Sequence, residues 1–300
     1  MIDPLAEVVS LLQPSARFSK SVTGAGAWRF QRSDEGEPLY CVVLEGGFHV
    51  EIDGHDAIEL CAGDFLLVPA VHGVTMSSLM PVTTDMETQP VALPGGGFRV
   101  GSLEGPSDLH VLVGHCRFGS PDAGLLVSLL PKLVHIRGDR RLTMLVKLVE
   151  EEARTQRPAR EMVLARLLEV MLIEALRSTD GTTASPGLVQ GLADARLANA
   201  LRAMHERPEH RWTIDELAKE GALSRSAFFE RFNRALGVAP MEYLLAWRMA
   251  LAKNLLRQNQ VTVAEVAERV GYSSGSTFSV AFSRHVGLPP TRFVQEHGTS

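Results

Sequence analysis

The sequence contains little that is typical of a secreted, membrane-spanning or disulfide-linked protein. Its three cysteines, Cys41, Cys61 and Cys116, are odd in number and widely spaced, which excludes a disulfide framework and indicates buried thiols in a reducing compartment. A redox-sensing pair is the alternative. No run of about 18 apolar residues occurs, so we expect no membrane-spanning helix. The N-terminus lacks a basic segment followed by an apolar run, so we expect a cytoplasmic protein.

The chain also lacks an excess of positive charge, although the deficit is uneven along its length. Lys and Arg number 30 against 35 Asp and Glu, which gives a net charge of −5. Residues 187–300 hold 14 basic and 11 acidic residues, a balance of +3, whereas residues 1–186 balance at −8. The sequence therefore predicts a nucleic-acid surface in the C-terminal part. Because +3 is modest, we expect one domain to bind DNA weakly, which favours a dimer.

The last hundred residues contain one helical pattern twice, over 213–232 and 262–282. In each copy a Thr and a Glu three residues later form a capping box at the start of a short helix, as Thr213 and Glu216 do. A glycine, Gly221 or Gly271, is expected to end that helix in the left-handed conformation. Ser224 and Ser273 are then expected to begin the second helices. The pattern predicts two helix-turn-helix units, which present a second helix to the DNA major groove.

The segment between the two units predicts a long helix from Pro240 to about Gln258. Leu244, Trp247, Leu251 and Leu255 form its apolar stripe. A rigid helix of this kind would hold the units at a fixed separation. Because half-sites one DNA turn apart lie roughly 34 Å from each other, the chain could enter two successive major grooves.

The second helix of each unit has an inward and an outward face. Phe228, Phe232 and Ala235 are predicted to point inward in the first unit, and Phe278 and Phe282 in the second. The outward residues expected to contact bases are Ser226, Phe229, Glu230, Asn233, Ser276, Ser279 and Val280. The flanking cations expected to contact phosphates are Arg225, Arg231, Arg234, Lys253 and Arg284. Neither outward face offers an Arg or Gln suited to bidentate base contacts, so we expect the first unit to carry most direct specificity.

These residues resemble the DNA-binding domain of the AraC/XylS-type transcription regulators over 188–298. The resemblance is carried by Trp212-Thr213, Ala218, Ser224-Arg225-Ser226, Phe232, Gly237, Pro240, Arg248, Ala252, Leu255-Leu256, Ala264, Ala267, Gly271-Tyr272, Phe278, Phe282, Gly287, Pro289 and Phe293. It implies a seven-helix domain, promoter double-stranded DNA and RNA polymerase as partners, and Gly275 as a further base-contacting position. At most of the family's base-contacting positions this sequence has small or apolar residues, which is a departure from direct readout of bases.

The N-terminal half predicts many short strands between about Trp28 and Cys116. Tyr40–Leu44 and Phe65–Val68 are apolar runs, and Phe48–Asp53 alternates with period two. Glycine-rich turn signals separate them at 45–47, 53–55, 62–64 and 94–97. This arrangement is typical of an all-β barrel or sandwich.

Part of this half resembles a cupin, a small jelly-roll barrel. The stretch from Gly46 to His72, with Gly63 and Pro69, carries the first resemblance, and 114–118 with 129–138 resemble the cupin-type sensor domain of one branch of AraC-type regulators. The resemblance covers roughly 5–138 and implies a domain that senses a small-molecule effector. We place this domain at 1–138.

Features that a cupin enzyme needs are scarce. No His-x-His pair occurs, and His49 and Glu51 offer two ligands where a competent metal site requires at least three. No Ser-His-Asp set, phosphate-binding loop or dinucleotide fingerprint is evident. We therefore expect no metal, no cofactor, no catalytic residue and no enzymatic activity. A metal-dependent cupin enzyme fused to a DNA-binding domain is the alternative from another class, and a constitutive DNA-binding scaffold is a third.

Two helical patterns follow the barrel, over 139–155 and 158–178. The second is apolar on more than one face, which predicts packing on the barrel and on a partner subunit, and therefore a homodimer through 139–178. Residues 179–187 are rich in Gly, Pro, Ser and Thr and predict a linker. We place the DNA-binding domain at 188–300.

A cluster of arginines lies where the barrel is expected to meet these helices. Arg137, Arg140 and Arg141 are similar to the Arg-x-x-x-Arg element with which PilZ-type domains hold cyclic di-GMP. With His72 they are candidate effector-binding residues. A solvated basic turn is the alternative.

The sequence thus predicts an α+β multidomain protein: a cupin-like β-barrel, a helical dimerisation segment and an all-α domain with two helix-turn-helix units. The predicted function is a sequence-specific transcription regulator, an activator under the control of a small-molecule signal that an anionic nucleotide such as cyclic di-GMP could supply. A redox-sensing regulator that uses its cysteines is the alternative signal.

Overall fold

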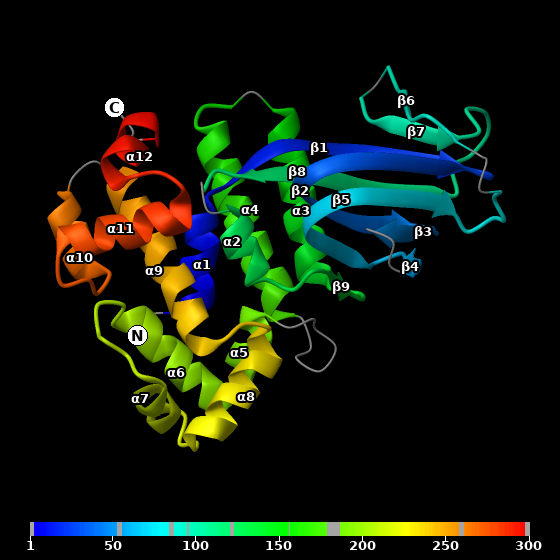
Figure 1. Cartoon of the computed structure of the whole chain (residues 1–300). Coiled ribbons are helices and arrows are strands. Elements are labelled where there is room, and N and C mark those ends of the chain that lie inside the picture. Colours follow the sequence, from blue (N-terminus) through cyan, green and yellow to red (C-terminus); the bar gives the residue numbers. More distant parts are fainter. Residues whose placement is uncertain are drawn as a thin grey trace. The chain divides into compact units, whose positions relative to one another are not determined.

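The computed structural model describes residues 3–52, 56–83, 87–94, 96–120, 123–155, 157–178, 187–257 and 261–297 (Figure 1). They form two compact units. The barrel unit contains the described residues of Gln13–Gly119 and Lys132–Thr183, and the helical unit contains those of Met1–Leu12, Ser120–Pro131 and Ala184–Ser300. The α+β class is confirmed, but two short segments of the expected sensor domain belong to the helical unit.

The barrel unit is built on one mixed sheet. Its strands are β1 (Pro14–Ala25), β2 (Arg29–Glu45), β3 (Gly47–Ile52), β4 (Ile58–Cys61), β5 (Phe65–Ser78), β6 (Val91–Ala92), β7 (Phe98–Gly101), β8 (Leu109–Phe118) and β9 (Val134–Ile136). Their order is β4-β3-β5-β2-β8-β1-β7-β6, with β9 paired to β5. Most pairs are antiparallel, and β1 with β7 is parallel. The central strands β8, β2 and β1 bring residues far apart in sequence onto one face.

The central strands are longer than the short strands that we expected. β2 has 17 residues and β5 has 14. Their pairing shifts register twice between Ser33 and Leu39, where Gly36 has a φ of +74°. Extra residues of this kind bend a strand and increase its twist, so one strand continues around the barrel. Gly46, in the expected turn at 45–47, has a φ of +74°, and a Cβ there would lie 1.9 Å from the backbone oxygen of Asp108. Only glycine fits that position.

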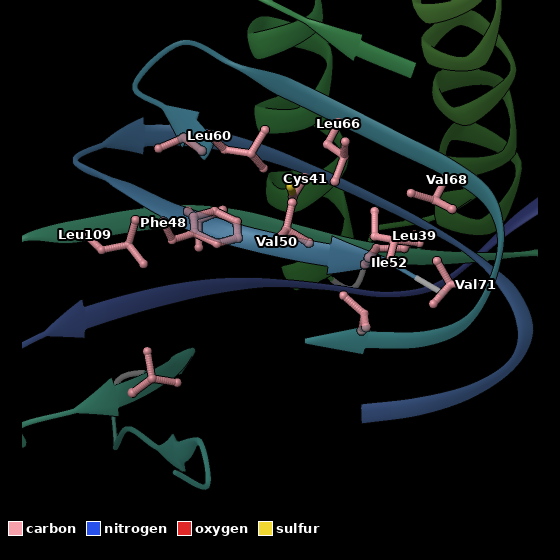
Figure 2. Close-up of a cluster of buried hydrophobic side chains, with 14 of the residues drawn as sticks. Leu39, Cys41, Phe48, Val50, Ile52, Leu60, Leu66, Val68, Val71 and Leu109 are labelled. Atoms are coloured by element: carbon pink, nitrogen blue, oxygen red, sulfur yellow. The ribbon is translucent and has the colours of Figure 1, made fainter. Parts of the chain in front are cut away.

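An apolar cluster fills the inside of this sheet (Figure 2). Phe48, Val50 and Ile52 alternate along β3 and are almost completely buried, as the period-two pattern predicted. Cys41 lies in the same cluster. The inner face of the sheet is therefore continuously apolar, and part of it lines a cavity that is described below.

Two helices cover part of the barrel unit, as the sequence predicted. They are α3 (Arg140–Arg154) and α4 (Arg160–Arg177), which pack on each other and on β1. Asp139 caps α3 by accepting hydrogen bonds from the backbone N–H groups of Arg141 and Leu142, at 2.8 and 3.0 Å. No helix within the described ranges is long and apolar enough to cross a membrane. The expected turn at 53–55 and residues 179–186 of the expected linker lie outside the described residues.

The helical unit contains eight helices in residues 187–257 and 261–297, where the family resemblance implied seven. They are α5 (Leu188–Ala193), α6 (Ala195–Glu206), α7 (Ile214–Glu220), α8 (Arg225–Leu236), α9 (Pro240–Arg257), α10 (Val263–Arg269), α11 (Gly275–Val286) and α12 (Pro290–His297). The difference arises at Asp194, whose extended backbone ends α5 and begins α6. The predicted long helix is α9.

The helical unit also holds α1 (Pro4–Leu12) and α2 (Ala123–Ser128), which the sequence assigned to the sensor domain. α1 packs on α6 and α9, and α2 packs on α9. The His205 ring, stacked on Trp247, has its Nδ1 2.7 Å from the Glu7 carboxylate of α1 and its Nε2 2.7 Å from the Tyr243 hydroxyl. Val8 and Leu12 of α1 are completely buried. The N-terminal helix is therefore part of the core of this unit.

Candidate nucleic-acid interface

The two helix-turn-helix units begin with the predicted capping boxes. The backbone N–H of Glu216 donates to the Thr213 hydroxyl at 3.2 Å, and the Thr213 N–H donates to the Glu216 carboxylate at 2.8 Å. Thr262 and Glu265 repeat this geometry at 3.2 and 2.7 Å. Because both boxes satisfy otherwise unpaired helix donors, the starts of α7 and α10 are fixed by local sequence.

The turns match the expectation in part. Gly271 follows α10 with a φ of +82°, as predicted. Gly221 was predicted to be left-handed but has a φ of −87°, and Ala222 takes the positive φ of 49° instead. Ser224 caps α8 as predicted, whereas α11 is capped by Ser274 and not by Ser273. Ser274 accepts a hydrogen bond from the N–H of Thr277 at 3.2 Å, so α11 begins one residue later than expected.

The second helices of the two units, α8 and α11, are called the recognition helices, and they bury the predicted faces. Phe228 and Phe232 on α8 and Phe278 and Phe282 on α11 are completely buried. On the outward side of α8, Ser226, Glu230 and Asn233 are exposed, and Phe229 is 39% exposed. Phe229 borders a surface depression together with Ser226 and Glu230.

The outward side of α11 offers few groups for base readout. Val280 is 73% exposed. The Ser279 hydroxyl donates to the Gly275 carbonyl at 2.7 Å, and the Ser283 hydroxyl donates to the Ser279 carbonyl at 2.7 Å, so both protons are already used inside the helix. Ser276 is exposed and lies 2.9 Å from the Ser274 hydroxyl. This face is mainly apolar and hydroxylic.

The predicted phosphate-contacting cations differ in their surroundings. Arg225 pairs with Asp215 at 2.8 Å, and Arg231 pairs with Asp194. Partial burial acts to raise the pKa of Asp194, but hydrogen bonds from Arg231 and the backbone and the Arg231 charge lower it overall. Arg234 and Arg284 are exposed. Lys253 does not match its predicted place on the DNA-facing surface. It lies in α9 with 7% of its surface exposed, because it faces the core of the unit.

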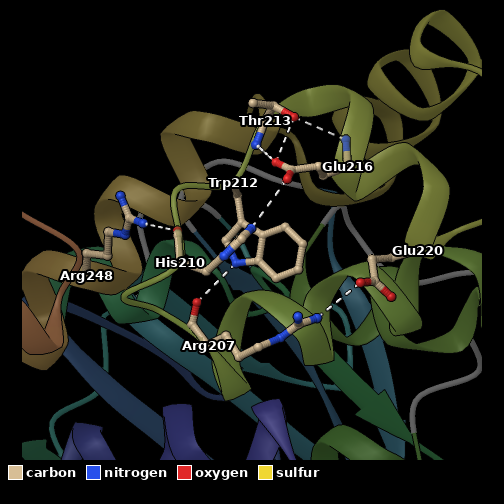
Figure 3. Close-up of polar contacts among 7 residues, drawn as sticks. All are labelled: Arg207, His210, Trp212, Thr213, Glu216, Glu220 and Arg248. Carbon is tan, nitrogen blue, oxygen red and sulfur yellow. Dashed lines mark hydrogen bonds and ion pairs between the residues drawn. The ribbon is translucent and has the colours of Figure 1, made fainter.

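Sequence reasoning assigned no role to Arg248, whose side chain reaches the loop before α7 (Figure 3). Its Nε donates to the Pro208 carbonyl at 2.7 Å, and its Nη2 donates to the His210 carbonyl at 2.6 Å. These carbonyls lie in the loop before α7. A Cβ on Gly271, in the turn of the second unit, would lie 2.8 Å from Arg248 Nη2. Burial lowers the pKa of Arg248. Because α9 carries this side chain, it fixes the loop of one unit and borders the turn of the other.

The same loop is held at its other end by Trp212. Its indole N–H donates to the Arg207 carbonyl at 3.1 Å, and the Arg207 guanidinium lies 4.6 Å from the ring centroid (Figure 3). Arg207 also pairs with Glu220 of α7 at 3.1 Å. The family signature Trp212-Thr213 therefore positions α7 and, through it, α8.

The barrel unit contains a cavity of about 330 Å³ that the sequence did not reveal. Its lining residues are Lys20, Val22, Trp28, Phe30, Arg32, Leu39, Phe48, Val74, Met76, Gln89, Pro90, Phe98, Val100, Leu109, Val111, Val113 and His115. Leu109, Val111, Val113 and His115 are every second residue of β8, which is the one signal that would have placed them on a common face. Pockets of this size and apolar character bind small molecules.

The candidate effector residues of the arginine turn do not line this cavity. Arg137, Arg140 and Arg141 are exposed, and Arg141 pairs with Glu174 of α4 at 3.3 Å. Arg140 borders a shallow depression with Gly63, Gly138, Thr143, Met144 and Lys147. His72 is exposed on β5 beside Gly36, whose Cβ would lie 3.0 Å from the His72 ring. The four residues do not form one site.

The three cysteines and the candidate metal ligands differ in their surroundings. Cys41 and Cys116 are buried, and burial raises the pKa of each thiol to about 12. Cys61 is exposed, with its sulfur 3.6 Å from the Glu59 carboxylate. His49 lies 4.0 Å from the same Glu59. Within the part of the chain that the structure describes, no group of three or more His, Cys, Asp or Glu residues is arranged to hold a metal ion.

Comparison with known proteins agrees with this geometry. Residues 3–179 match the cupin family, and residues 217–296 match the helix-turn-helix domain family. The chain is 33% identical to an AraC-like transcription regulator of Streptomyces lividans, over 96% of this chain and 97% of the relative. It is 32% identical to a second such regulator from Streptomyces antibioticus over the same shares. It is 28% identical to the HTH-type transcriptional regulator AlkR of Acinetobacter baylyi, over 90% and 92%.

The match therefore includes both units, the buried aromatic faces of α8 and α11 and the cupin sheet, and the chain belongs to the AraC-like DNA-binding transcription regulators with an N-terminal cupin domain.

Proposed function

We propose that this regulator reads promoter DNA with α8 and uses α11 mainly as a phosphate clamp and shape reader. The observation that carries the proposal is the contrast between the two outward faces. α8 presents Phe229, which can contact a thymine methyl, and the exposed Glu230, whose carboxylate can accept a hydrogen bond from a cytosine amino group. α11 presents Val280 beside hydroxyls whose protons are already donated within the helix. Arg284 on α11 supplies an exposed positive charge for the DNA backbone.

A randomised-site selection tests this division. We expect a half-site under α8 with clear base preferences and a half-site under α11 with weak ones. Arg284→Ala should weaken binding about equally for all sequences and lower the salt slope by about one, whereas Glu230→Ala should relax preference at particular base pairs. Arg269→Ala, an exposed arginine on α10, is the matched control for loss of charge. A half-site under α11 as sharp as that under α8 would overturn the proposal.

We further propose that the protein is a homodimer through 139–178. The support is the exposed apolar surface of both helices: Met144 and Leu148 lie four residues apart on α3, and Val163 and Val170 lie seven apart on α4, with exposures between 41% and 61%. Leu168 and Leu172, on the other face of α4, are completely buried within the barrel unit. Leu148→Glu should therefore give a folded monomer in sedimentation, whereas Leu168→Glu should unfold the unit. A dimer that survives Leu148→Glu combined with Val163→Glu would refute this interface.

For the signal we propose that the cupin cavity, and not the arginine turn, takes a small-molecule effector. Arg141 is engaged by Glu174, and the turn offers only a shallow surface, so cyclic di-GMP has no enclosing site at these residues. The cavity strands also connect directly to the helical unit along the chain. β1 carries Lys20 and Val22 and follows α1, and β8 precedes α2. A ligand between β1 and β8 would act on the two strands whose ends lead into α1 and α2.

An activator of this type would recruit RNA polymerase to the promoter. In vitro transcription with purified polymerase tests this: we expect transcript from a target promoter to rise with the regulator present. Lower transcript would show that the protein represses instead.

A further inference from the structure

We propose that α8 reads the amino group and the C5 position of one cytosine together, so that 5-methylcytosine is its preferred base and cytosine methylation strengthens promoter binding. This inference rests on the proposed function, in which α8 reads bases, and it names the base and the covalent modification that α8 recognises.

An aromatic ring and a carboxylate share one place on the surface of α8. Phe229 and Glu230 border a surface depression whose other lining residues are Ile214, Ser224, Arg225 and Ser226. The depression is formed within the first helix-turn-helix unit, because Ile214 begins α7, Ser224 caps α8 and the other residues lie in the first half of α8. In helix-turn-helix proteins the N-terminal part of the recognition helix contacts base edges. Phe229 and Glu230 are therefore placed to meet the same base.

Glu230 supplies an acceptor, because an ionised carboxylate accepts hydrogen bonds and donates none. Its side chain is exposed, and the cation in the same depression, Arg225, is paired with Asp215 of α7 at 2.8 Å. In the major groove, two kinds of base group donate hydrogen bonds: the amino group of cytosine and that of adenine. Glu230 is therefore complementary to one of these two bases.

Phe229 distinguishes cytosine from adenine. Its ring is 39% exposed, and it precedes Glu230 directly in the chain. Beside its amino group adenine presents the N7 acceptor, whereas cytosine presents its apolar C5 position. An N7 atom against a phenyl ring would lose its hydrogen bond to water without a replacement, which is unfavourable. An aromatic ring beside a carboxylate therefore favours cytosine.

A methyl group at C5 completes the match. 5-Methylcytosine keeps the amino group of cytosine and carries its methyl group where thymine carries one. Burial of this methyl group against the Phe229 ring should tighten binding about fourfold, which corresponds to ~0.8 kcal/mol. Thymine offers the same methyl group, but the O4 acceptor beside it would face the Glu230 carboxylate with no proton between them. We therefore expect affinity to fall in the order 5-methylcytosine, cytosine, thymine.

Four bases separate the two contributions: cytosine and uracil lack the methyl group, and 5-methylcytosine and thymine carry it. Each is placed in turn at every cytosine under α8 in a duplex from the randomised-site selection, opposite its complementary purine. The affinity of the full-length protein is measured by fluorescence anisotropy of labelled DNA at one salt concentration. At one position we expect 5-methylcytosine to bind about fourfold more tightly than cytosine, and cytosine roughly tenfold more tightly than uracil.

Two variants assign each contribution to its side chain. Phe229→Ala should abolish the advantage of 5-methylcytosine over cytosine and keep the advantage of cytosine over uracil. Glu230→Gln should do the reverse, because an amide both donates and accepts and so suits either base. Met241→Ala and Glu242→Gln are the matched controls, since these residues are an adjacent, exposed apolar and acidic pair on α9, and they should change neither ratio.

The outcomes separate this inference from the proposed function. Equal or weaker binding of 5-methylcytosine at every position, or a methyl effect that persists in Phe229→Ala, would overturn the inference. A half-site under α8 with clear preferences but no cytosine would also overturn it, while the proposed division between α8 and α11 would stand. A half-site under α8 without base preferences would contradict the proposed function and, with it, this inference.

Discussion

Replacement of Arg248 by Met tests whether one side chain of α9 holds the two helix-turn-helix units in register. The substitution removes two charge-assisted hydrogen bonds, to the carbonyls of Pro208 at 2.7 Å and His210 at 2.6 Å. Each such bond is worth about 1.5–3 kcal/mol, and because Arg248 is only half-buried, water can replace part of the loss, so we expect ~2–4 kcal/mol for the pair. Met keeps most of the apolar stem, so little of this figure comes from packing.

The measurement is urea unfolding of the helical unit, followed by the fluorescence of Trp212 and Trp247 in a Trp28→Phe background. The free energy of unfolding should fall by the amount above. Affinity for DNA with both half-sites should fall more than affinity for DNA with the first half-site alone, because the loop before α7 and the turn at Gly271 both border Arg248. Arg248→Lys keeps the charge but not the fork, and should recover less than half of the loss.

Arg211→Met is the matched control, since Arg211 lies in the same loop and is exposed. It should change neither quantity. An Arg248→Met protein with wild-type stability, or one that loses affinity equally for single and paired half-sites, would refute the reasoning that Arg248 sets the register of the two units.

Three further predictions follow from buried or strained groups. Burial is the main cause that lowers the pKa of His205, against the opposing effect of Glu7. As pH falls below about 6.5, the unfolded chain therefore takes up the proton first, and the free energy of unfolding of the helical unit should fall. His205→Gln should make that free energy depend less on pH between pH 7 and 5, and an unchanged dependence would count against this reasoning. With pKa values of about 12, Cys41 and Cys116 should resist iodoacetamide at pH 8 while the exposed Cys61 reacts, and mass spectrometry that finds Cys41 alkylated in folded protein would contradict this and reopen the redox alternative. Gly46→Ala should destabilise the barrel unit by at least ~1–2 kcal/mol in thermal unfolding, because its φ is +74° and the new Cβ would overlap the Asp108 carbonyl, whereas Gly105→Ala, with a similar φ and open space, should cost only the backbone strain.

The sequence alone determined those features whose causes lie within a few residues. Capping boxes at Thr213 and Thr262, the positive φ at Gly271 and the buried faces of α8 and α11 follow from hydrogen bonds and periodicities that span one or two helical turns. The alternation along β3 fixed its inward face for the same reason. Where two neighbouring residues could serve one purpose, the local signal was ambiguous: the chain uses Ala222 and not Gly221 for the left-handed position, and Ser274 and not Ser273 for the cap.

Only the tertiary structure decided the features that depend on contacts between distant segments. It placed α1 in the core of the helical unit, through His205 and a residue 198 positions away in sequence, Glu7. It buried Lys253, which we had expected to flank a recognition face and contact a phosphate, and it brought Lys20, Arg32 and His115 from three strands to one cavity. A side chain's partners across a sheet or a helix bundle are set by the register and packing of whole elements, and no periodicity in a single segment encodes that choice.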